Sequence, residues 1–350
     1  MATPTIAIAG SSGKLGGATL RALLAHDMVP ASSVIALTSS QPGSATFDGL
    51  AAQARGLQVR HASFEEPASV EDALGGGVER FFLVSTPHVG LDFDRAVDSG
   101  DGDGERKWEE VPSGQGRERH HRVAIDAAVK AGVKHIVYSS LAFAFDPATR
   151  SGKSSSKAGV MRAHLRTEAY LAGLRKQGKL DSVTVIREGL YAESWPLYLG
   201  YFSPDGGGKD RDRSEVPLAG DGKISWTAIP DLGVANALVL ASPSGEFANR
   251  TFYLSTRASS AKNMSEIAGV VGAARGKEVK VKKVSREEHE RYYVKERGVD
   301  EPAVRWWAST YEALEDGEAE VDDGMLEELL GRVGRKPEMV EDVIARMVKG

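Results

Sequence analysis

The stretch Thr5-Ile6-Ala7-Ile8-Ala9-Gly10-Ser11-Ser12-Gly13-Lys14-Leu15-Gly16-Gly17 decides the fold of this chain. It joins a short apolar run, a turn with glycines at three-residue spacing and the helix-like run 18–25. Gly10 suits a tight turn, Gly13 lets backbone N–H groups approach a phosphate, and Gly16 lets the helix pack close to the strand. Because a helix start carries free N–H groups and a partial positive charge, the stretch predicts a dinucleotide pyrophosphate site. A glycine-rich turn without a ligand is the plainer alternative.

The rest of the chain alternates strand-length apolar runs with helical patterns. Buried strands separated by helices are typical of a parallel sheet with right-handed crossovers. We therefore predict an α/β fold with a Rossmann-like, doubly wound parallel sheet. Residues 98–119 contain few apolar side chains and predict an exposed insertion. The runs that support this interpretation are 5–9, 18–25, 34–37, 59–62, 81–84, 123–131 and 136–139.

The composition excludes several classes of protein. The 350 residues are 41% hydrophobic and 27% charged with a net charge of −5, and no dense basic stripe indicates direct nucleic-acid binding. The absence of cysteine excludes disulfides, thiolate metal sites and cysteine nucleophiles. No segment approaches the roughly 20 apolar residues that span a bilayer, so we expect no membrane contact. The first apolar run is already the strand 5–9, and we expect a cytoplasmic protein.

The glycine spacing and several later segments carry a resemblance to one protein family. The spacing at residues 10–16 is G-x-x-G-x-x-G, whereas the usual dinucleotide fingerprint is G-x-G-x-x-G. With segments 59–75, 78–87, 132–141, 163–168, 185–196 and 220–233, it resembles the NmrA-like family, the atypical short-chain dehydrogenases, and its fungal members in particular. The resemblance implies a Rossmann domain at 1–195 and a smaller, mostly helical substrate lobe at 196–350. In this division, residues 220–256 return partly to the Rossmann domain.

The end of the second strand predicts the cofactor. A carboxylate there would bind the adenosine ribose, and a basic residue would accept a 2′-phosphate. Thr38, Ser39 and Ser40 provide neither, and with Lys14 nearby they favour NADP(H) over NAD(H). The resemblance adds two strand ends that line the ribose and nicotinamide in relatives. The predicted cofactor-binding residues are Gly10, Ser11, Ser12, Gly13, Lys14, Leu15, Gly16, Thr38, Ser39, Ser40, Ser85, Thr86, Pro87, Ser139, Ser140 and Leu141.

The catalytic residues depart from the usual pattern. Short-chain reductases carry Tyr-x-x-x-Lys, in which the tyrosine donates a proton and the lysine lowers its pKa. By the family's Lys-x-x-x-Glu pattern, the lysine position falls on His164 and the tyrosine position on Val160. Either His164 donates a proton or contacts the ribose, steered by Glu168 one turn on, or the two form only an i,i+4 pair and hydride transfer is lost. Lys157 is a second catalytic candidate.

Aromatic residues follow the sixth strand. They are Tyr191, Trp195, Tyr198, Tyr201 and Phe202, and they predict a flat apolar wall for a bulky aromatic or polyketide-like substrate. The alternative is a core that joins the two lobes, which is the favoured interpretation for Trp195.

The pair His120-His121 raises the question of a metal site. Adjacent histidines on a helix point in different directions, and no carboxylate or third histidine stands at ligand spacing in the sequence. The sequence therefore predicts no metal site.

Three functions stay open. The first is an NADPH-dependent oxidoreductase that reduces a carbonyl or quinone, which the aromatic residues favour. The second is a dinucleotide-binding redox sensor that acts on a protein partner, which the missing Tyr and Lys favour. The third is a redox-neutral dehydratase or isomerase. A homodimer and a regulatory protein partner are both compatible with the sequence.

Overall fold

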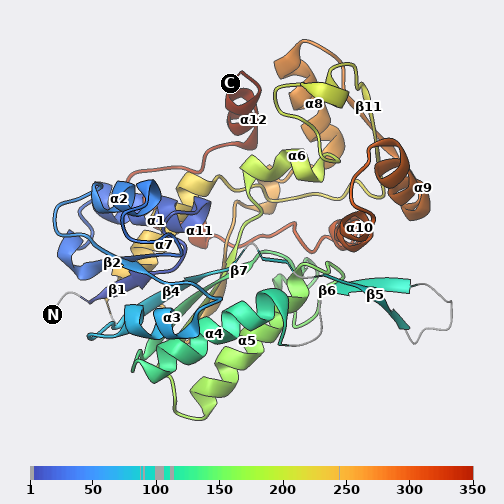
Figure 1. Cartoon of the computed structure of the whole chain (residues 1–350). Coiled ribbons are helices and arrows are strands. Elements are labelled where there is room, and N and C mark those ends of the chain that lie inside the picture. Colours follow the sequence, from blue (N-terminus) through green and yellow to red (C-terminus); the bar gives the residue numbers. More distant parts are fainter. Residues whose placement is uncertain are drawn as a thin grey trace.

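The computed structural model describes residues 4–86, 88–89, 91–98, 106–110, 114–243 and 245–349, with the strands 91–98 and 106–110 described by their backbone alone. Figure 1 shows a sheet with helices on both faces and, beside it, a smaller lobe that is mostly helical. The α/β fold class predicted from the sequence is confirmed.

Seven parallel strands form the central sheet in the order β12-β10-β7-β4-β1-β2-β3. The chain therefore builds outward in both directions from β1, and the carboxyl ends of all the strands lie at one edge. Ligands of such sheets bind at this edge, where the strand order reverses between β1 and β4. The strands are β1 (Ile6–Ile8), β2 (Val34–Thr38), β3 (Gln58–His61), β4 (Arg80–Val84), β7 (His135–Leu141), β10 (Ser182–Glu188) and β12 (Thr251–Leu254).

Alternate side chains of the strands enter two separate cores. In β1, Ile6 and Ile8 pack into the core between the sheet and a first set of helices, whereas Ala7 packs into the core between the sheet and a second set. The first set is α1 (Lys14–Ala25), α2 (Ala45–Ala51), α7 (Ile229–Ala241) and α11 (Met325–Arg332). The second set is α3 (Pro67–Leu74), α4 (Gly116–Lys130) and α5 (Met161–Lys176).

A glycine sets the distance between α1 and α7. A Cβ atom on Gly233 would lie 2.7 Å from the carbonyl carbon of Ala18. Because real Cβ atoms do not approach backbone this closely, only glycine permits the observed packing of the two helices. This packing holds the start of α1 against the sheet.

The smaller lobe has its own apolar core. Its helix α8 begins with a capping box of Asn263 and Glu266, and it ends at Gly276 in the left-handed region. Helix α8 spans Met264–Arg275. The lobe also contains α6 (Trp195–Tyr198), α9 (Arg286–Arg291), the π-helical turn Tyr292–Glu296, α10 (Glu301–Glu315) and α12 (Val340–Lys349). Two strands, β11 (Glu215–Leu218) and β13 (Lys280–Lys283), pair in parallel.

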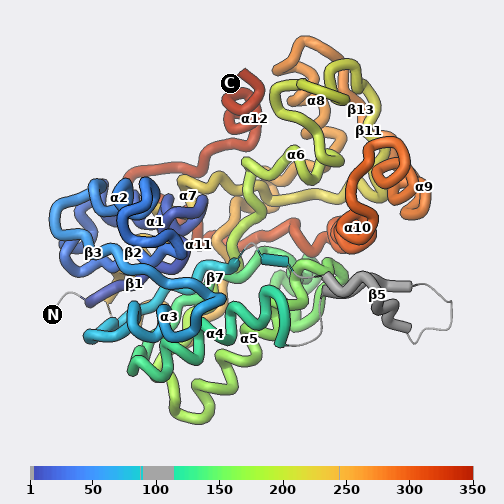
Figure 2. The backbone as a smooth tube through the Cα atoms, viewed as in Figure 1, coloured from blue at the N-terminus to red at the C-terminus, as the bar shows by residue number. Residues whose placement is uncertain are grey.

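The chain passes between sheet and lobe more than once. After α6 it returns to the sheet through α7 and β12, and after α10 it returns again through α11. Figure 2 shows the final segment, in red, running past α7 to α12, which lies beside α8. The division into 1–195 and 196–350 stays a prediction. Among the described residues, no helix is long and apolar enough to cross a bilayer.

Two residues, Arg117 and Glu118, differ from the exposed insertion expected over 98–119, whereas Gln115 and Arg119 are exposed. Helix α4 begins at Gly116, and the side chains of Arg117 and Glu118 are buried. Their burial depends on contacts with α5, which the local composition does not reveal. The backbone of 91–98 and 106–110 forms an antiparallel ribbon, β5 (Leu91–Asp98) and β6 (Arg106–Glu110). Two short strands, β8 (Phe145–Asp146) and β9 (Ser151–Gly152), form a second ribbon.

Candidate functional site

The turn between β1 and α1 has the geometry that its glycines predict. Gly10 adopts φ +64°, which favours glycine. A Cβ atom on Gly16 would lie 2.4 Å from the carbonyl oxygen of Gly10, so Gly16 allows the helix to begin directly against the turn. The Gly13 N–H donates to the Gly10 carbonyl at 2.8 Å, and the Ser11 N–H donates to the Leu37 carbonyl of β2 at 3.0 Å. The turn is therefore rigid before any ligand binds.

Free N–H groups mark the outer side of this turn. Within the described part of the chain, the N–H groups of Ser12, Lys14 and Leu15 donate to no other group. Gly10, Ser12 and Gly13 are exposed, so an anion can reach the turn. The Ser11 side chain is different, because it is buried and donates to the Ile8 carbonyl at 2.8 Å. Any ligand contact of Ser11 would therefore come from its backbone.

Hydroxyl groups lie at the end of β2, as predicted. The Oγ of Ser12 lies 3.1 Å from the Oγ1 of buried Thr38, and the Ser40 N–H donates to the same Thr38 oxygen at 3.2 Å. The sequence analysis missed His61 at the end of neighbouring β3, whose Nδ1 lies 3.2 Å from the Ser40 carbonyl oxygen. Register pairs Thr38 with His61, a relation that only the sheet topology reveals.

Lys14 lies on the side of α1 that faces α7. It lines an open groove of about 590 Å³ together with Arg21, Glu193 and Arg335. Its side chain is exposed and can therefore change conformation. The sequence argument placed Lys14 near the cofactor. In the structure its ammonium group can turn either toward the turn between β1 and α1 or toward this groove.

The two adjacent histidines of α4 hold the predicted cofactor residues after β4. The Nε2 of His121 lies 3.0 Å from the Oγ of Ser85, and the Nδ1 of His120 lies 3.2 Å from the Oγ1 of Thr86. Adjacent helical side chains point in different directions, and this divergence lets each ring contact one hydroxyl of a consecutive pair. Pro87, the third predicted residue here, lies outside the described residues.

Behind Ser85, a buried hydrogen-bond network leads to His164. The Nδ1 of His121 lies 2.9 Å from the Thr167 hydroxyl and 3.3 Å from that of Tyr138. The Tyr138 hydroxyl lies 2.9 Å from the Nδ1 of His164, whose Nε2 lies 3.2 Å from an Arg117 nitrogen. His164 is therefore connected to the site through other side chains.

The protonation of His164 follows from its partners. An arginine can only donate, so the Nε2 of His164 accepts and its Nδ1 carries the proton donated to Tyr138. Burial, followed by the positive charge of Arg117, holds the pKa of His164 well below its usual range. Burial in the same way lowers the pKa of His121 to about 3. Both rings are neutral near pH 7, and a neutral imidazole is a weak proton donor.

Glu168 does not pair with His164, and both interpretations that joined these residues are wrong on this point. Its carboxylate accepts from the Ser140 hydroxyl at 2.6 Å and forms an ion pair with Arg187 at 2.9 Å. Arg187 stands in β10, in register with Ser140 of β7, so the competing cation comes from an adjacent strand. Spacing along one helix could not reveal this competitor.

A buried carboxyl group that the sequence analysis missed lies at the end of β10. Glu188 is fully buried, and among the described residues neither of its oxygens has a hydrogen-bond partner of normal geometry. Ser139, on the adjacent strand β7, and Asn236 of α7 are polar neighbours that act to lower its pKa. Burial raises the pKa of Glu188 to about 8, so the carboxyl group is mainly protonated at neutral pH. The predicted residue Leu141 stands opposite Glu188 in the sheet.

Lys157 lies at the surface, in contact with the smaller lobe. Its Nζ lies 2.7 Å from an Asp316 oxygen, and this contact raises the pKa of the ammonium group. Its backbone N–H donates to buried Glu318 at 3.0 Å. A lysine with a raised pKa holds its proton firmly, which disfavours acid catalysis by Lys157.

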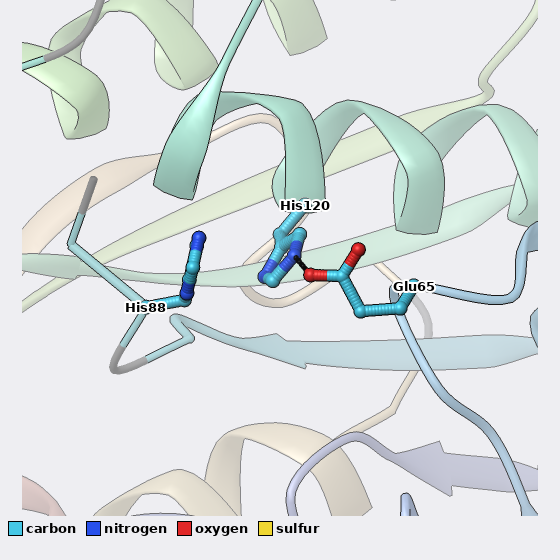
Figure 3. A group of neighbouring side chains, drawn as sticks. All are labelled: Glu65, His88 and His120. Atoms are coloured by element: carbon cyan, nitrogen blue, oxygen red, sulfur yellow. Dashed lines mark hydrogen bonds and ion pairs between the residues drawn. The ribbon is translucent and has the colours of Figure 1, made fainter.

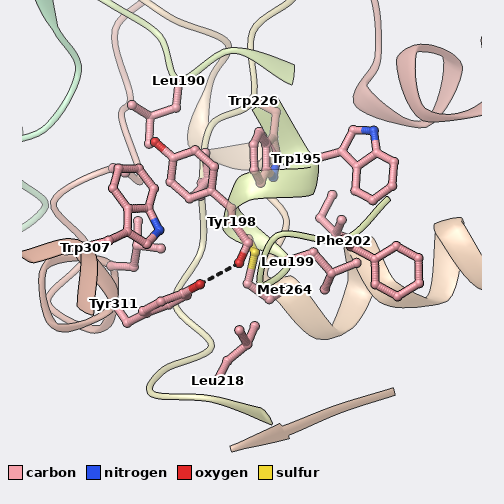
Figure 4. Packing of buried hydrophobic residues seen from close by; sticks show 14 of the residues in the cluster. Leu190, Trp195, Tyr198, Leu199, Phe202, Leu218, Trp226, Met264, Trp307 and Tyr311 are labelled. Atoms are coloured by element: carbon pink, nitrogen blue, oxygen red, sulfur yellow. Dashed lines mark hydrogen bonds between the residues drawn. The ribbon is translucent and has the colours of Figure 1, made fainter. Parts of the chain in front are cut away.

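Three of the five predicted substrate-pocket aromatics belong to the core of the smaller lobe. Trp195, Tyr198 and Phe202 are buried at 0%, 5% and 1% exposure. Figure 4 shows Tyr198 beside Trp226 and Trp307, and the Tyr311 hydroxyl donates to the Tyr198 carbonyl at 2.8 Å. The lobe's own helices cover these three rings. The burial of Trp195 agrees with the core interpretation favoured for it, and the burial of Tyr198 and Phe202 favours the same alternative over a substrate wall. Tyr191 and Tyr201 are half-buried.

The structure also corrects the reason given against a metal site. Glu65, from the loop after β3, and His88, from the loop after β4, both lie beside His120 (Figure 3). The ligand atoms of the three side chains lie within 4.8 Å of one another. A carboxylate and another histidine are therefore near His120, although both are remote from it in the sequence.

The chain is similar to known proteins over most of its length. The model of the NmrA-like family matches residues 2–328. The NmrA-like family domain-containing oxidoreductase flvB of Aspergillus flavus is 29% identical over 93% of this chain and 90% of that protein. Quinone oxidoreductase 2 of Escherichia coli is 29% identical over 80% of this chain and 78% of that protein.

Solved structures are similar over almost the whole chain. Triphenylmethane reductase of Citrobacter sp., complexed with NADP(H), has a TM-score of 0.71 and 26% identity, covering 98% of this chain and 99% of that one. The NADPH-dependent quinone oxidoreductase QOR2 of Escherichia coli, complexed with NADPH, has a TM-score of 0.70 and 25% identity, with the same coverage of both chains.

Proposed function

The chain belongs to the NmrA-like family, and on this basis we propose that it is an NADPH-dependent oxidoreductase that reduces a quinone or conjugated carbonyl of an aromatic small molecule. The observation that carries the proposal is the turn between β1 and α1, where free N–H groups and closely packed glycines form a rigid anion-binding surface. Similar proteins support the redox chemistry, because their names describe a quinone oxidoreductase and a triphenylmethane reductase.

The residues at the carboxyl edge of the sheet fit NADPH. The N–H groups of Ser12, Lys14 and Leu15 would bind the pyrophosphate. Ser39 and Ser40 would contact the adenosine ribose, where no carboxylate repels a 2′-phosphate. The remaining residues proposed for the cofactor are Gly10, Ser11, Gly13 and Gly16 of the turn, Thr38 of β2, Ser85, Thr86 and Pro87 after β4, and Ser139, Ser140 and Leu141 of β7.

When bound, NADPH would supply a hydride. Reduction of a carbonyl also consumes a proton, which solvent water would supply, and the half-buried Ser85 hydroxyl at the sheet edge would orient the carbonyl oxygen. His121 positions this hydroxyl at 3.0 Å. His164 acts through Tyr138 and His121, which makes it a positioning residue and not a direct proton donor.

The substrate class rests on the relatives and on the two half-buried tyrosines. Tyr191 stands three residues after the carboxyl end of β10 and forms an isolated bridge with Thr227. Burial raises the pKa of its hydroxyl, so the ring stays neutral and can contact a flat aromatic acceptor. Tyr201, in the smaller lobe, is the second candidate contact.

The proposal is tested first by binding and then by turnover. Calorimetric titration with NADPH and NADH should give tighter binding of NADPH. The Gly16→Ala variant, whose new Cβ would meet the Gly10 carbonyl oxygen, should bind NADPH at least about tenfold more weakly, which equals about 1.4 kcal/mol. Gly173→Ala is the matched control, because its Cβ in α5 meets no atom within 4 Å and its affinity should be unchanged.

Oxidation of NADPH is then followed against quinones, aromatic ketones and a triphenylmethane dye. Turnover with any of them supports an oxidoreductase. Tight NADPH binding without turnover would contradict the enzymatic part and favour a dinucleotide sensor, which the missing Tyr and Lys also favour. A product of unchanged oxidation state, formed without loss of NADPH, would favour a dehydratase or isomerase. Failure to bind any dinucleotide would refute the argument from the turn.

A further inference from the structure

Three side chains from separate segments meet beside the loop after β4. We propose that Glu65, His88 and His120 form a binding site for a divalent transition-metal ion of the zinc class. Figure 3 shows His120 between the other two, with its ring pointing from α4 toward the loops that carry them. Two imidazoles and one carboxylate are a ligand set that zinc binds readily, with a fourth position left for water.

The three side chains are near one another but not yet at the spacing of ligands on a bound ion. The Nε2 of His120 lies 2.6 Å from an oxygen of Glu65, and the ligand atoms of all three residues lie within 4.8 Å. In a tetrahedral site with bonds of about 2.0–2.1 Å, neighbouring ligand atoms lie about 3.3 Å apart. Binding therefore requires Glu65 and His120 to separate slightly and His88 to approach.

His88 is free to make this movement. Its ring stacks on that of His120, with centroids 4.7 Å apart and an angle of 27° between the planes. Stacked rings do not aim their nitrogen lone pairs at one point, so His88 must rotate to become a ligand. Among the described residues its ring has no hydrogen bond, and the residue is exposed, so rotation breaks only the stacking contact.

Thr86 supplies the outer contact that a metal-binding histidine needs. A ligating histidine usually donates its second ring N–H to an oxygen, which fixes the tautomer. The Nδ1 of His120 lies 3.2 Å from the Oγ1 of Thr86, and a hydroxyl oxygen can accept as well as donate. Without a metal, the Nε2–H of His120 donates to Glu65 at 2.6 Å. A bound ion would displace this proton, and the tautomer with Nδ1–H donating to Thr86 would then present the Nε2 lone pair to the ion.

Burial and exposure also fit a site that is open on one side. The His120 side chain is only 6% exposed, whereas that of Glu65 is 56% exposed. The buried ring gives a fixed anchor, and the exposed carboxylate gives an entry path and a charge that partly neutralises the ion.

The direct test is zinc binding by the full chain, produced without a polyhistidine tag and freed of metal with a chelator. Calorimetric titration with Zn²⁺ should give one ion per chain. Substitution of the two exposed ligands, His88→Ala and Glu65→Gln, should each weaken binding at least about tenfold. Because both side chains are exposed, neither change should affect folding, which circular dichroism checks. His26→Ala is the matched control, since His26 is an exposed histidine outside the cluster.

The outcomes separate clearly. Binding of one ion that both variants weaken and the control does not supports the site. Absence of stoichiometric binding, or equal affinity in the wild type and both variants, would overturn it. A loss in His26→Ala as large as that in His88→Ala would also overturn it, because binding would then be scattered over surface histidines. Titration with Co²⁺ adds a spectroscopic measurement, because the visible absorption of bound Co²⁺ reports how many ligands coordinate the ion.

One consequence rests on the proposed function. Thr86, the outer contact of His120, is also a proposed cofactor residue, so bound Zn²⁺ should change the affinity for NADPH in the wild type but not in His88→Ala. If zinc binds and NADPH does not, the metal site stands and the proposed function fails. If NADPH binds and zinc does not, the reverse holds.

Discussion

Replacing Glu188 with glutamine should make the protein more stable at high pH and leave its stability at low pH nearly unchanged. Glu188 stands at the carboxyl end of β10, fully buried, with the Asn236 amide and the Ser139 hydroxyl as polar neighbours. Burial disfavours the ionised carboxylate and raises its pKa to about 8 from the ordinary 4.5. Glutamine has nearly the same shape and no charge at any pH.

The sign and the size of the effect follow from linkage. Below pH 4.5 the carboxyl group is protonated in both the folded and the unfolded chain, and it adds no pH dependence. Between about pH 4.5 and 8 only the folded chain holds the proton, so the free energy of unfolding of the wild type falls as the pH rises. At about 1.4 kcal/mol per pH unit, the loss reaches an upper limit of about 5 kcal/mol near pH 8.

The assay is reversible urea unfolding at several pH values from 5 to 8.5, followed by circular dichroism. The difference in unfolding free energy between Glu188→Gln and the wild type should be small at pH 5 and rise to several kcal/mol in favour of the variant at pH 8.5, an order-of-magnitude figure. Glu287→Gln is the control, because Glu287 is fully exposed and its pKa is lowered by the Ser285 hydroxyl. A difference for Glu188→Gln that stays constant across this range would refute the reasoning, since it would mean that the buried carboxyl group is ionised throughout.

Two further predictions concern helix packing and the catalytic candidates. Gly233→Ala should force α1 and α7 apart and lower the free energy of unfolding by about 1–3 kcal/mol. Gly173→Ala, in an open helical position, should instead raise the free energy of unfolding by about 0.5–1 kcal/mol. Equal effects of the two substitutions in urea titration would contradict the packing argument. His164→Phe should lower the free energy of unfolding by about 1–3 kcal/mol, because it leaves the Tyr138 hydroxyl and the Arg117 guanidinium without this buried partner. Lys157→Ala should change the free energy of unfolding by less than about 0.5 kcal/mol and leave turnover intact. Loss of turnover in Lys157→Ala would restore that residue as a catalytic group, and an unchanged stability of His164→Phe would contradict the buried hydrogen bonds assigned to His164.

Part of the site was predictable because it depends on neighbours in the sequence. The turn from Gly10 to Gly16 needs glycine for local steric reasons, which the structure bears out with φ +64° at Gly10 and the close contact at Gly16. The resemblance to the NmrA-like family is confirmed by the family match over residues 2–328. The preference for NADP(H) agrees with the solved relatives, which bind NADP(H) and NADPH. The individual cofactor contacts stay predictions.

Other parts were not predictable because they depend on partners that come from distant segments. Glu168 was expected to pair with His164 on its own helix, but Arg187 of the adjacent strand forms a stronger, charged contact with it. Tyr198 and Phe202 follow a strand end, as pocket residues do, but helices from the last third of the chain cover them. No local pattern contains the position of these covering elements.

The sequence by itself determined the strand, turn and helix at residues 5–25 and the alternation of strands and helices that builds the sheet, because steric limits and hydrophobic periodicity act over a few residues. The motifs along the chain also determined its family. Only the tertiary structure decided the charge state of His164, the burial of Glu188 and the meeting of His120 with Glu65 and His88. Those properties depend on desolvation and on contacts between segments far apart in the chain, and the order of the strands in the sheet brings these segments together.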